Sequence, residues 1–69
     1  MTLIEISLNG RAHPLPPGTT LHELIAELDL VGKSLAVSIN RRVIKRTEWP
    51  TRRIDAADRI EIVHAIGGG

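Results

Sequence analysis

The residues best suited to chemistry are the last three, Gly67, Gly68 and Gly69, which directly follow an alternating apolar run at residues 60–66. A glycine run inside a chain is typical of a flexible linker. After a strand, it instead presents the terminal carboxylate on backbone that carries no side chains, and such a segment can pass through a narrow channel. We therefore expect residues 67–69 to be a mobile tail with the carboxylate of Gly69 as its reactive group. A frayed terminus without function or an expression scar is the alternative.

Side chains elsewhere offer little support for catalysis. His13, His22 and His64 are scattered, and no Asp, Glu or Cys stands at a metal-binding spacing. The chain has no cysteine, and its serines lack the context of a nucleophile elbow. The terminal glycines open no helix, so they cannot form a phosphate loop. These side chains therefore give no argument for catalysis within the chain or for a metal site.

Positive charge gathers in the middle of the chain. Residues 33–53 carry seven basic side chains against the single acidic Glu48, while the whole chain has a net charge of +1. This segment can steer a nucleic acid or an acidic protein, or it can be a set of solvated charges that protect sheet edges. Binders of single-stranded nucleic acid usually stack bases on aromatic side chains. Because Trp49 is the only aromatic residue, nucleic acid is not the expected partner.

Length and composition describe one small domain. The chain has 69 residues, of which 42% are hydrophobic and 25% charged, an ordinary globular composition. With Trp49 as the only aromatic residue, Leu, Ile, Val and Ala must build the core. The lack of cysteine agrees with a cytoplasmic location, and no apolar run approaches the ~20 residues that span a bilayer.

The first half of the chain predicts a hairpin followed by a helix. Apolar residues alternate from Ile4 to Leu8, and Asn9-Gly10 is the strongest short signal for a type I′ turn. Residues 11–15 should return as an antiparallel strand, at an edge of the sheet because they contain Pro14.

Thr20 and Glu23 have the spacing of a capping box. Apolar residues then recur with helical spacing at Leu21, Leu24, Ile25 and Leu28. Gly32 stands where a helix-terminating residue is expected.

The second half predicts three strands. The expected elements are a strand at residues 35–39, a tight turn at 40–42, a short strand at 43–44, a helical turn at 47–49, a polar turn at 55–58 and a last strand at 59–66. A single helix must cover one face of the sheet. The fold class is therefore α+β, a mixed sheet of about five strands packed on one main helix. The apolar density of the last strand places it centrally, parallel to the first.

Two stretches resemble a known family. Residues 35–49, LAVSINRRVIKRTEW, and residues 58–69, DRIEIVHAIGGG, are similar to the ThiS family of thiamine-biosynthesis sulfur carriers, which has the ubiquitin-like β-grasp fold. The likeness covers the whole chain and implies a β-grasp domain at residues 1–66 with a glycine tail at 67–69. One departure is Ala57, where the family usually has glycine before Asp58, a change that affects the turn backbone.

The resemblance implies that the protein is not an enzyme but a carrier, with no bound cofactor, that is a co-substrate of partner enzymes. A ThiF-type, E1-like enzyme would use ATP to adenylate the carboxylate of Gly69, and a sulfur donor would convert the adenylate to a thiocarboxylate. A ThiG-type thiazole synthase would take the sulfur. Gly68 would pass through the partners' channels, with Gly67 allowing the approach.

Three other functions compete with this reading. The small subunit of molybdopterin synthase shares the fold, tail and chemistry, although its family usually opens with an aromatic-rich strand. A ubiquitin-related protein modifier would join the tail to a lysine of another protein. An RNA-binding β-grasp module would use the basic residues 33–53.

The last strand also suggests where partners dock. Ile60, Ile62 and Ile66 point to one face of the sheet, and Glu61, Val63 and Ala65 point to the other. The richer apolar set should pack under the helix. Val63 and Ala65 would then form a small exposed patch at the base of the tail, with Arg41 and Arg42 adding electrostatic steering.

Overall fold

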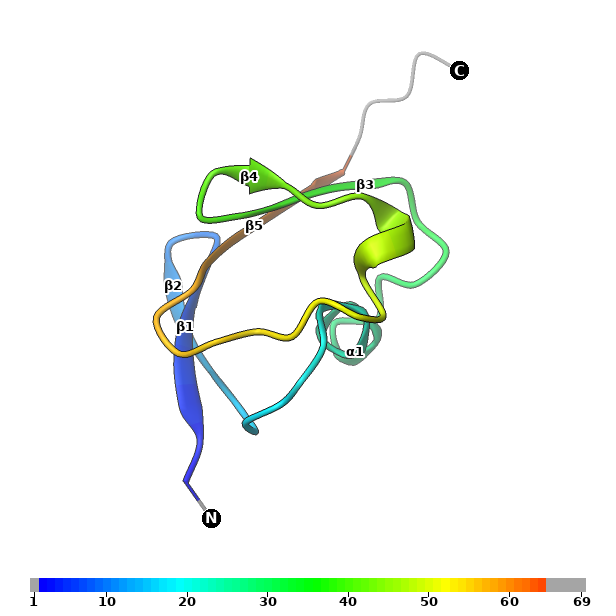
Figure 1. The fold of residues 1–69 in the computed structure, drawn as a ribbon. Helices are drawn as coiled ribbons and strands as arrows, with labels where there is room; N and C mark the ends of the chain where they lie inside the picture. Colours follow the sequence, from blue (N-terminus) through cyan, green and yellow to red (C-terminus); the bar gives the residue numbers. More distant parts are fainter. Residues whose placement is uncertain (1, 65–69) are drawn as a thin grey trace.

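The computed structural model describes residues 2–64, which form five strands, one α-helix and one 3-10 helix (Figure 1). The chain begins with a hairpin of β1 (Ile4–Leu8) and β2 (Arg11–Leu15), paired antiparallel. Its two-residue turn has positive φ at both positions, 50° at Asn9 and 83° at Gly10. The predicted strands and the type I′ turn are confirmed.

The helix α1 (Leu21–Glu27) begins at the predicted capping box. The Thr20 hydroxyl accepts a hydrogen bond from the Glu23 N–H at 3.2 Å, and the Thr20 N–H donates to the Glu23 carboxylate at 2.8 Å. Hydrogen bonding of the carboxylate to the Thr20 backbone N–H, and to a smaller degree to the Thr20 side chain, holds the pKa of the Glu23 carboxyl below its ordinary value.

The end of α1 differs from the prediction, because Asp29 and not Gly32 is the left-handed terminating residue. Asp29 has φ 61°, and its N–H donates to the Ala26 carbonyl at 3.0 Å. The Leu30 N–H donates to the Ile25 carbonyl, also at 3.0 Å, which completes a Schellman motif. Asp tolerates the left-handed region, so the helix ends directly after its apolar stripe. Gly32, with φ 86°, serves the connection to the next strand.

A second hairpin joins β3 (Leu35–Ile39) to β4 (Arg42–Val43), and η1 (Arg46–Glu48) follows. The strand at 35–39 is confirmed. The other two elements begin one residue earlier than predicted, because Asn40 and Arg41 alone form the turn. Their φ values of 53° and 69° are those of a two-residue type I′ turn.

Trp49 lies at the end of η1 and belongs to the core, with 5% of its surface exposed. Its indole N–H donates to the carbonyl of Ile44 at 3.1 Å, which satisfies the buried polar group. Ile44, predicted as a strand residue, follows β4 and is buried. Trp49 therefore fills the core and is not an exposed side chain for a partner to bind.

The last strand, β5 (Arg59–His64), lies in the middle of the sheet. The strand order is β2-β1-β5-β3-β4, with β5 parallel to β1 and antiparallel to β3. The predicted central position is confirmed, as is the edge position of the strand that contains Pro14. Residues 65 and 66 of the predicted strand lie outside the described residues.

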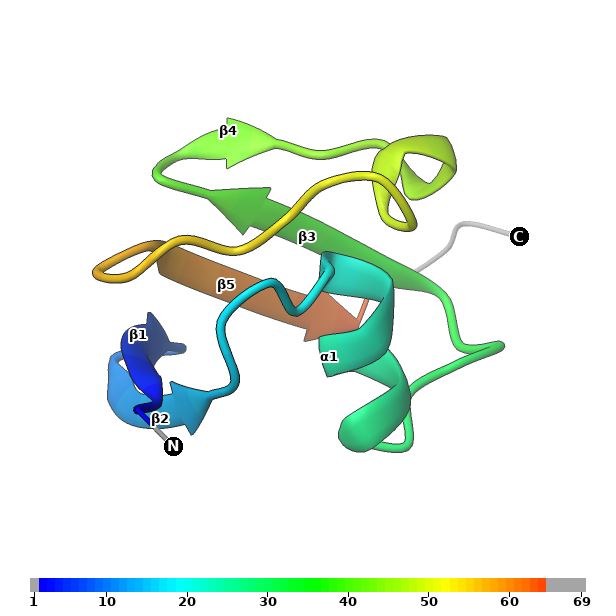
Figure 2. The same cartoon turned by 60° about the horizontal axis from the view of Figure 1, so that its bottom comes forward.

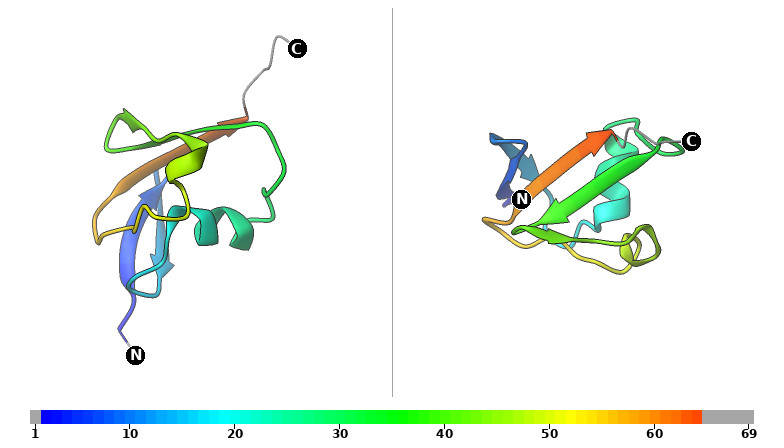
Figure 3. Two further views of the ribbon diagram at one scale, coloured as in Figure 1. Left: turned by 45° about the vertical axis from the view of Figure 1, so that its right-hand side comes forward. Right: turned by 90° about the horizontal axis from the view of Figure 1, so that it is seen from above.

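The helix α1 crosses one face of this sheet, and the opposite face carries no helix in the described chain (Figures 2 and 3). The core between α1 and the sheet is aliphatic apart from Trp49. Its buried members are Ile6, Leu15, Leu21, Leu24, Ile25, Val37, Ile39, Ile44, Trp49, Ile54, Ile60 and Ile62. In the described residues, neither helix has the length and apolar character needed to cross a membrane.

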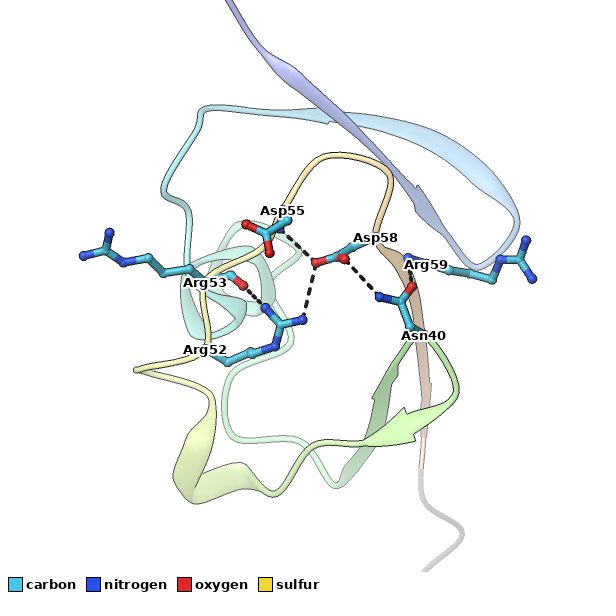
Figure 4. Close-up of polar contacts among 6 residues, drawn as sticks. All are labelled: Asn40, Arg52, Arg53, Asp55, Asp58 and Arg59. Atoms are coloured by element: carbon cyan, nitrogen blue, oxygen red, sulfur yellow. Dashed lines mark hydrogen bonds and ion pairs between the residues drawn. The ribbon is translucent and has the colours of Figure 1, made fainter.

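A polar network fixes the start of β5 (Figure 4). The side chain of Asp58 is 8% exposed and lies 3.5 Å from the Arg52 guanidinium. It accepts hydrogen bonds from the Asn40 amide at 3.1 Å and from the Asp55 N–H at 2.8 Å. The Asn40 amide oxygen in turn accepts from the Arg59 N–H at 2.9 Å. The network therefore ties the β3–β4 turn to the loop before β5.

Ala57, in that loop, has a φ of 68°. This left-handed conformation is costly for a residue with a Cβ. The N–H of Ala57 donates to the carbonyl of Glu5 at 2.9 Å, which holds the loop against β1. Ala57 thus occupies a backbone conformation that favours glycine, and the effect of alanine on this turn stays a prediction.

Candidate functional site

The predicted reactive residues follow the last described strand. Gly67, Gly68 and Gly69 lie outside the described residues, and so does Ala65 of the predicted docking patch. The structure describes the strand that leads to them, which has β1 on one side and β3 on the other (Figure 3). The mobile tail, its reactive carboxylate and the domain boundary after residue 66 stay predictions.

The two faces of β5 are as the sequence predicts. Ile60 and Ile62 are buried against the core, whereas Glu61 is exposed and Val63 is 57% exposed. Side chains alternate between the faces of a strand, and the helix can cover only one face. The richer apolar set therefore lies under α1, and Val63 stays on the uncovered face.

Val63 has apolar neighbours from two other strands. Ala36 on β3 is its register partner, and Val43 on β4 is 75% exposed. Together with Ser38 and Glu61, these three residues line an open hollow on the sheet. We call Ala36, Val43 and Val63 the open-face patch. Only Val63 of this set was predicted from the sequence, although the alternation of apolar residues at 35–39 already puts Ala36 on the face opposite Val37.

The two arginines predicted to flank the patch separate in the structure. Arg41 lines a second hollow on the uncovered face, together with Ser7, Gly10, Arg59 and Glu61. Glu61 lines both hollows, so Arg41 lies near the open-face patch. Arg42 pairs with Ile39, whose side chain is buried in the core. The two-residue turn places Arg42 in β4 and not in the turn. Because paired residues point to the same face, the Arg42 side chain lies on the face of Ile39 and does not join the open-face patch.

The basic segment at 33–53 does not form one free charged surface. Arg46 places its guanidinium 5.1 Å from the centre of the Trp49 ring and donates to the carbonyl of Lys33 at 2.6 Å. Arg52, in the segment between η1 and β5, contributes to the Asp58 network. Two of the seven basic side chains thus make internal contacts.

The histidines remain apart, as expected. His13 on β2 has its Nε2 atom 3.7 Å from the carboxylate of Glu27, while His22 and His64 are exposed on other elements. Within residues 2–64, no three His, Asp or Glu side chains are placed to hold a metal ion. What the described site offers is a central strand, an apolar patch beside it and a nearby arginine, an arrangement that can present a following segment to a partner.

Comparisons with known sequences agree on one family. The profile of the ThiS family matches residues 6–69. The chain is 30% identical over 66 residues to the sulfur carrier protein ThiS of Escherichia coli, a match that covers 96% of this chain and 100% of that protein. It is 36% identical over 62 residues to the sulfur carrier protein ThiS of Thermus thermophilus, which covers 90% and 95% of the two chains.

A longer relative has a different name. The chain is 38% identical over 66 residues to a thiazole synthase of Magnetococcus marinus, a match that covers 96% of this chain but 20% of that protein. The chain thus spans about a fifth of that relative's length.

One solved structure shows the same fold. The crystal structure of the thiamine biosynthesis protein ThiS from Geobacter metallireducens matches with a TM-score of 0.83 at 20% identity, covering 96% of this chain and 100% of the other. The predicted β-grasp fold is therefore confirmed.

Proposed function

The chain belongs to the ThiS family, and on that premise we propose that it carries sulfur for the thiazole ring of thiamine. The observation that carries the proposal is the family match, which extends through residue 69 and so includes the three terminal glycines. The protein is a carrier and not an enzyme: the reacting group is its own carboxylate, and partners supply the catalysis.

The proposed cycle begins with the carboxylate of Gly69. A carboxylate oxygen attacks the α-phosphorus of ATP on the activating enzyme, which forms an acyl adenylate and releases pyrophosphate. A donor that supplies sulfur at the oxidation level of sulfide then displaces AMP and leaves a thiocarboxylate. When the synthase transfers the sulfur to its substrate, an oxygen from the acceptor or from water replaces the sulfur on the carbonyl carbon, and the carboxylate is regenerated. Gly68 and Gly67 carry no side chain, so they can follow the carboxylate into a narrow channel.

The architecture supports presentation of the terminus rather than catalysis. The tail follows β5, which pairs with a strand on each side. The open-face patch begins on this strand at Val63 and continues to Ala36 on β3 and Val43 on β4. A partner that docks on this patch sits beside the base of the tail. Exposed apolar side chains on a rigid sheet are well suited to such contacts.

Two partners follow from this proposal. A ThiF-type enzyme would adenylate Gly69, and a ThiG-type thiazole synthase would accept the sulfur. The second partner has separate support, because a ThiS-like segment is part of a relative named thiazole synthase. Physical fusion keeps a carrier at high effective concentration beside the enzyme that uses it. We also propose that the protein acts in the cytoplasm.

Accurate mass after incubation with a ThiF-type enzyme, ATP and a sulfide source tests the proposal. The expected product has gained the mass of one sulfur in place of one oxygen, and the change maps to the peptide that contains Gly69. A covalent conjugate of much higher mass would instead indicate a protein modifier. An unchanged mass, with pyrophosphate not released, would refute the carrier function. Transfer to a molybdopterin synthase large subunit but not to a thiazole synthase would favour the other pathway.

A further inference from the structure

The parallel pairing between β1 and β5 stops before β5 does. The register partners are Ser7 with Arg59 and Leu8 with Ile60, and the last backbone bond is from the Asn9 N–H to the Ile60 carbonyl at 2.9 Å. The chain then reverses at Gly10 into β2. On its other side, β5 remains paired with β3 as far as His64. Among the described residues, the β1-facing N–H and carbonyl of Ile62 therefore have no strand beside them.

The side chain of Asn9 takes the place of the missing strand. Its amide oxygen accepts a hydrogen bond from the Ile62 N–H at 2.9 Å, and its amide nitrogen donates to the Ile62 carbonyl at 3.2 Å. A side-chain amide has an acceptor oxygen and two donor hydrogens, so it satisfies both backbone groups of Ile62 that a longer β1 would otherwise bond. The two residues are 53 positions apart in the sequence.

Only a few residue types fit this position. Asn9 has a φ of 50°, as the type I′ turn requires, and Asn tolerates this left-handed conformation better than most residues. Glycine also fits the turn but has no amide. Aspartate fits the turn and can accept from the Ile62 N–H, but an ionised carboxylate has no proton to donate to the carbonyl.

From this geometry we infer that Asn9 is a positioning residue, which holds β5 at Ile62 and thereby sets the direction in which the strand delivers the reactive terminus. The inference rests on the proposed function. Ile62 precedes Gly69 by seven residues and adjoins Val63 of the open-face patch. Without the Asn9 amide, the end of β5 is held from the β3 side alone, and ordering it becomes a cost of each partner encounter.

The test compares the full-length wild-type chain with Asn9→Gly, which keeps the left-handed turn and removes the amide. Amide hydrogen exchange followed by NMR should show faster exchange at Ile62, by about tenfold, while the helical amide of Leu24 exchanges at the wild-type rate. Steady-state adenylation by a ThiF-type enzyme should show KM raised about three- to tenfold, the size expected for one lost hydrogen-bond pair. Because the seated carboxylate reacts as before, kcat should change less than about twofold.

Asn40→Gly is the matched control. Asn40 also occupies the first position of a two-residue turn, with φ 53°, and its side chain also bonds β5, but at Arg59 and not near the end of the strand. This variant should lose stability and keep the wild-type KM. A general loosening of the sheet would raise KM in both variants and would overturn the inference.

Asn9→Asp tests the role of the side-chain amide in a variant that keeps the turn. It should raise KM at neutral pH in the same direction as Asn9→Gly, because the donor to the Ile62 carbonyl is gone. If Asn9→Asp matches the wild type, or if Asn9→Gly is adenylated with the wild-type KM, the inference is wrong while the proposed function stands. If the wild-type chain is not adenylated at all, the proposed function fails and the inference fails with it.

Discussion

The side-chain amide of Asn40 donates a hydrogen bond to the buried carboxylate of Asp58, 3.1 Å away and 18 residues further along the chain (Figure 4). The contact joins the turn between β3 and β4 to the loop that leads into β5. It stabilises the end of β5 opposite the terminus, as the Asn9 amide does near Ile62. Two asparagines in similar turns thus support the same central strand at two points.

Removal of the Asp58 carboxylate should destabilise the fold. Asp58→Ala leaves the Asp55 N–H and the Asn40 amide without their acceptor. Hydrogen bonds to a buried charged group are worth about 1.5–3 kcal/mol each, so we expect the free energy of unfolding to fall by about 2–4 kcal/mol. Urea unfolding measures this loss. Asp55→Ala, at an exposed side chain in the same loop, is the control and should change stability by less than about 1 kcal/mol.

Ala57→Gly should stabilise the protein. The φ of 68° at Ala57 is unfavourable for any residue with a Cβ, and relief of that strain outweighs the extra freedom of glycine in the unfolded chain. We expect a gain of about 0.5–1 kcal/mol in the free energy of unfolding. Ala56→Gly, one residue earlier and without a positive φ, should have the opposite sign. Equal effects from both substitutions would contradict the strain argument.

Glu23 should titrate below its ordinary pKa, because the Thr20 backbone N–H, and to a smaller degree the Thr20 side chain, hydrogen-bond its ionised carboxylate. A group with a lowered folded-state pKa adds stability above its unfolded pKa and loses that stability as the pH falls through the folded value. The cap of α1 should therefore weaken in the acid range. NMR titration of the Glu23 carboxyl, with the urea-unfolded chain as reference, measures the shift. Thr20→Ala should move the pKa part of the way back, and identical values in the folded and unfolded chains would refute the cap.

Val63→Asp should weaken both proposed partner complexes without unfolding the domain. A charge at the centre of an apolar contact costs about 1–3 kcal/mol of binding, whereas an exposed strand position tolerates the change. Isothermal titration calorimetry with each partner gives the loss. Val31→Asp is a matched control, because Val31 is equally exposed, at 57%, and lies outside the open-face patch.

Ile62→Asp provides the complementary comparison for that face. Ile62 is 7% exposed, and an unpaired carboxylate in an apolar core is strongly disfavoured, so this variant should unfold. Normal binding of both partners by a folded Val63→Asp variant would place the docking surface elsewhere, with Arg41 the next residue to change.

Gly68→Ala should fold normally but be adenylated poorly, because a Cβ must enter a channel that is expected to fit bare backbone. Thermal unfolding should match the wild type, while the rate of pyrophosphate release falls. Deletion of Gly69 should likewise leave folding intact and abolish formation of the thiocarboxylate. If Gly68→Ala is adenylated at the wild-type rate, the channel argument is wrong.

Much of the fold followed from local signals in the sequence. The turn at Asn9-Gly10 and the capping box at Thr20 and Glu23 each need only residues within three positions of one another, so they can be recognised without knowledge of the fold. The same holds for the period of two in β5, which correctly assigned Ile62 to the core and Val63 to the uncovered face. Errors arose at element ends, where Asp29 ended the helix instead of Gly32, because several nearby residues can adopt a positive φ.

The candidate site was found only in part. The sequence identified the terminal glycines and Val63, and the resemblance to a family supplied their chemistry. Ala36 and Val43 were missed, because neighbours of Val63 across the sheet depend on which strands pair and in what register. Arg42 lies on the same face as Ile39, because the turn is one residue shorter than predicted, and its part in steering a partner stays a prediction.

The sequence by itself determined the elements and the buried face of each, because these depend on periodicity and on residue chemistry at short range. The reactive role of the terminal carboxylate stays a prediction. Only the tertiary structure decided what supports the central strand. The bonds from Asn9 to Ile62 and from Asn40 to Asp58 join residues 53 and 18 positions apart. A side-chain amide has the same bonding groups wherever it stands, and only the folded chain determines which backbone or carboxylate comes within reach.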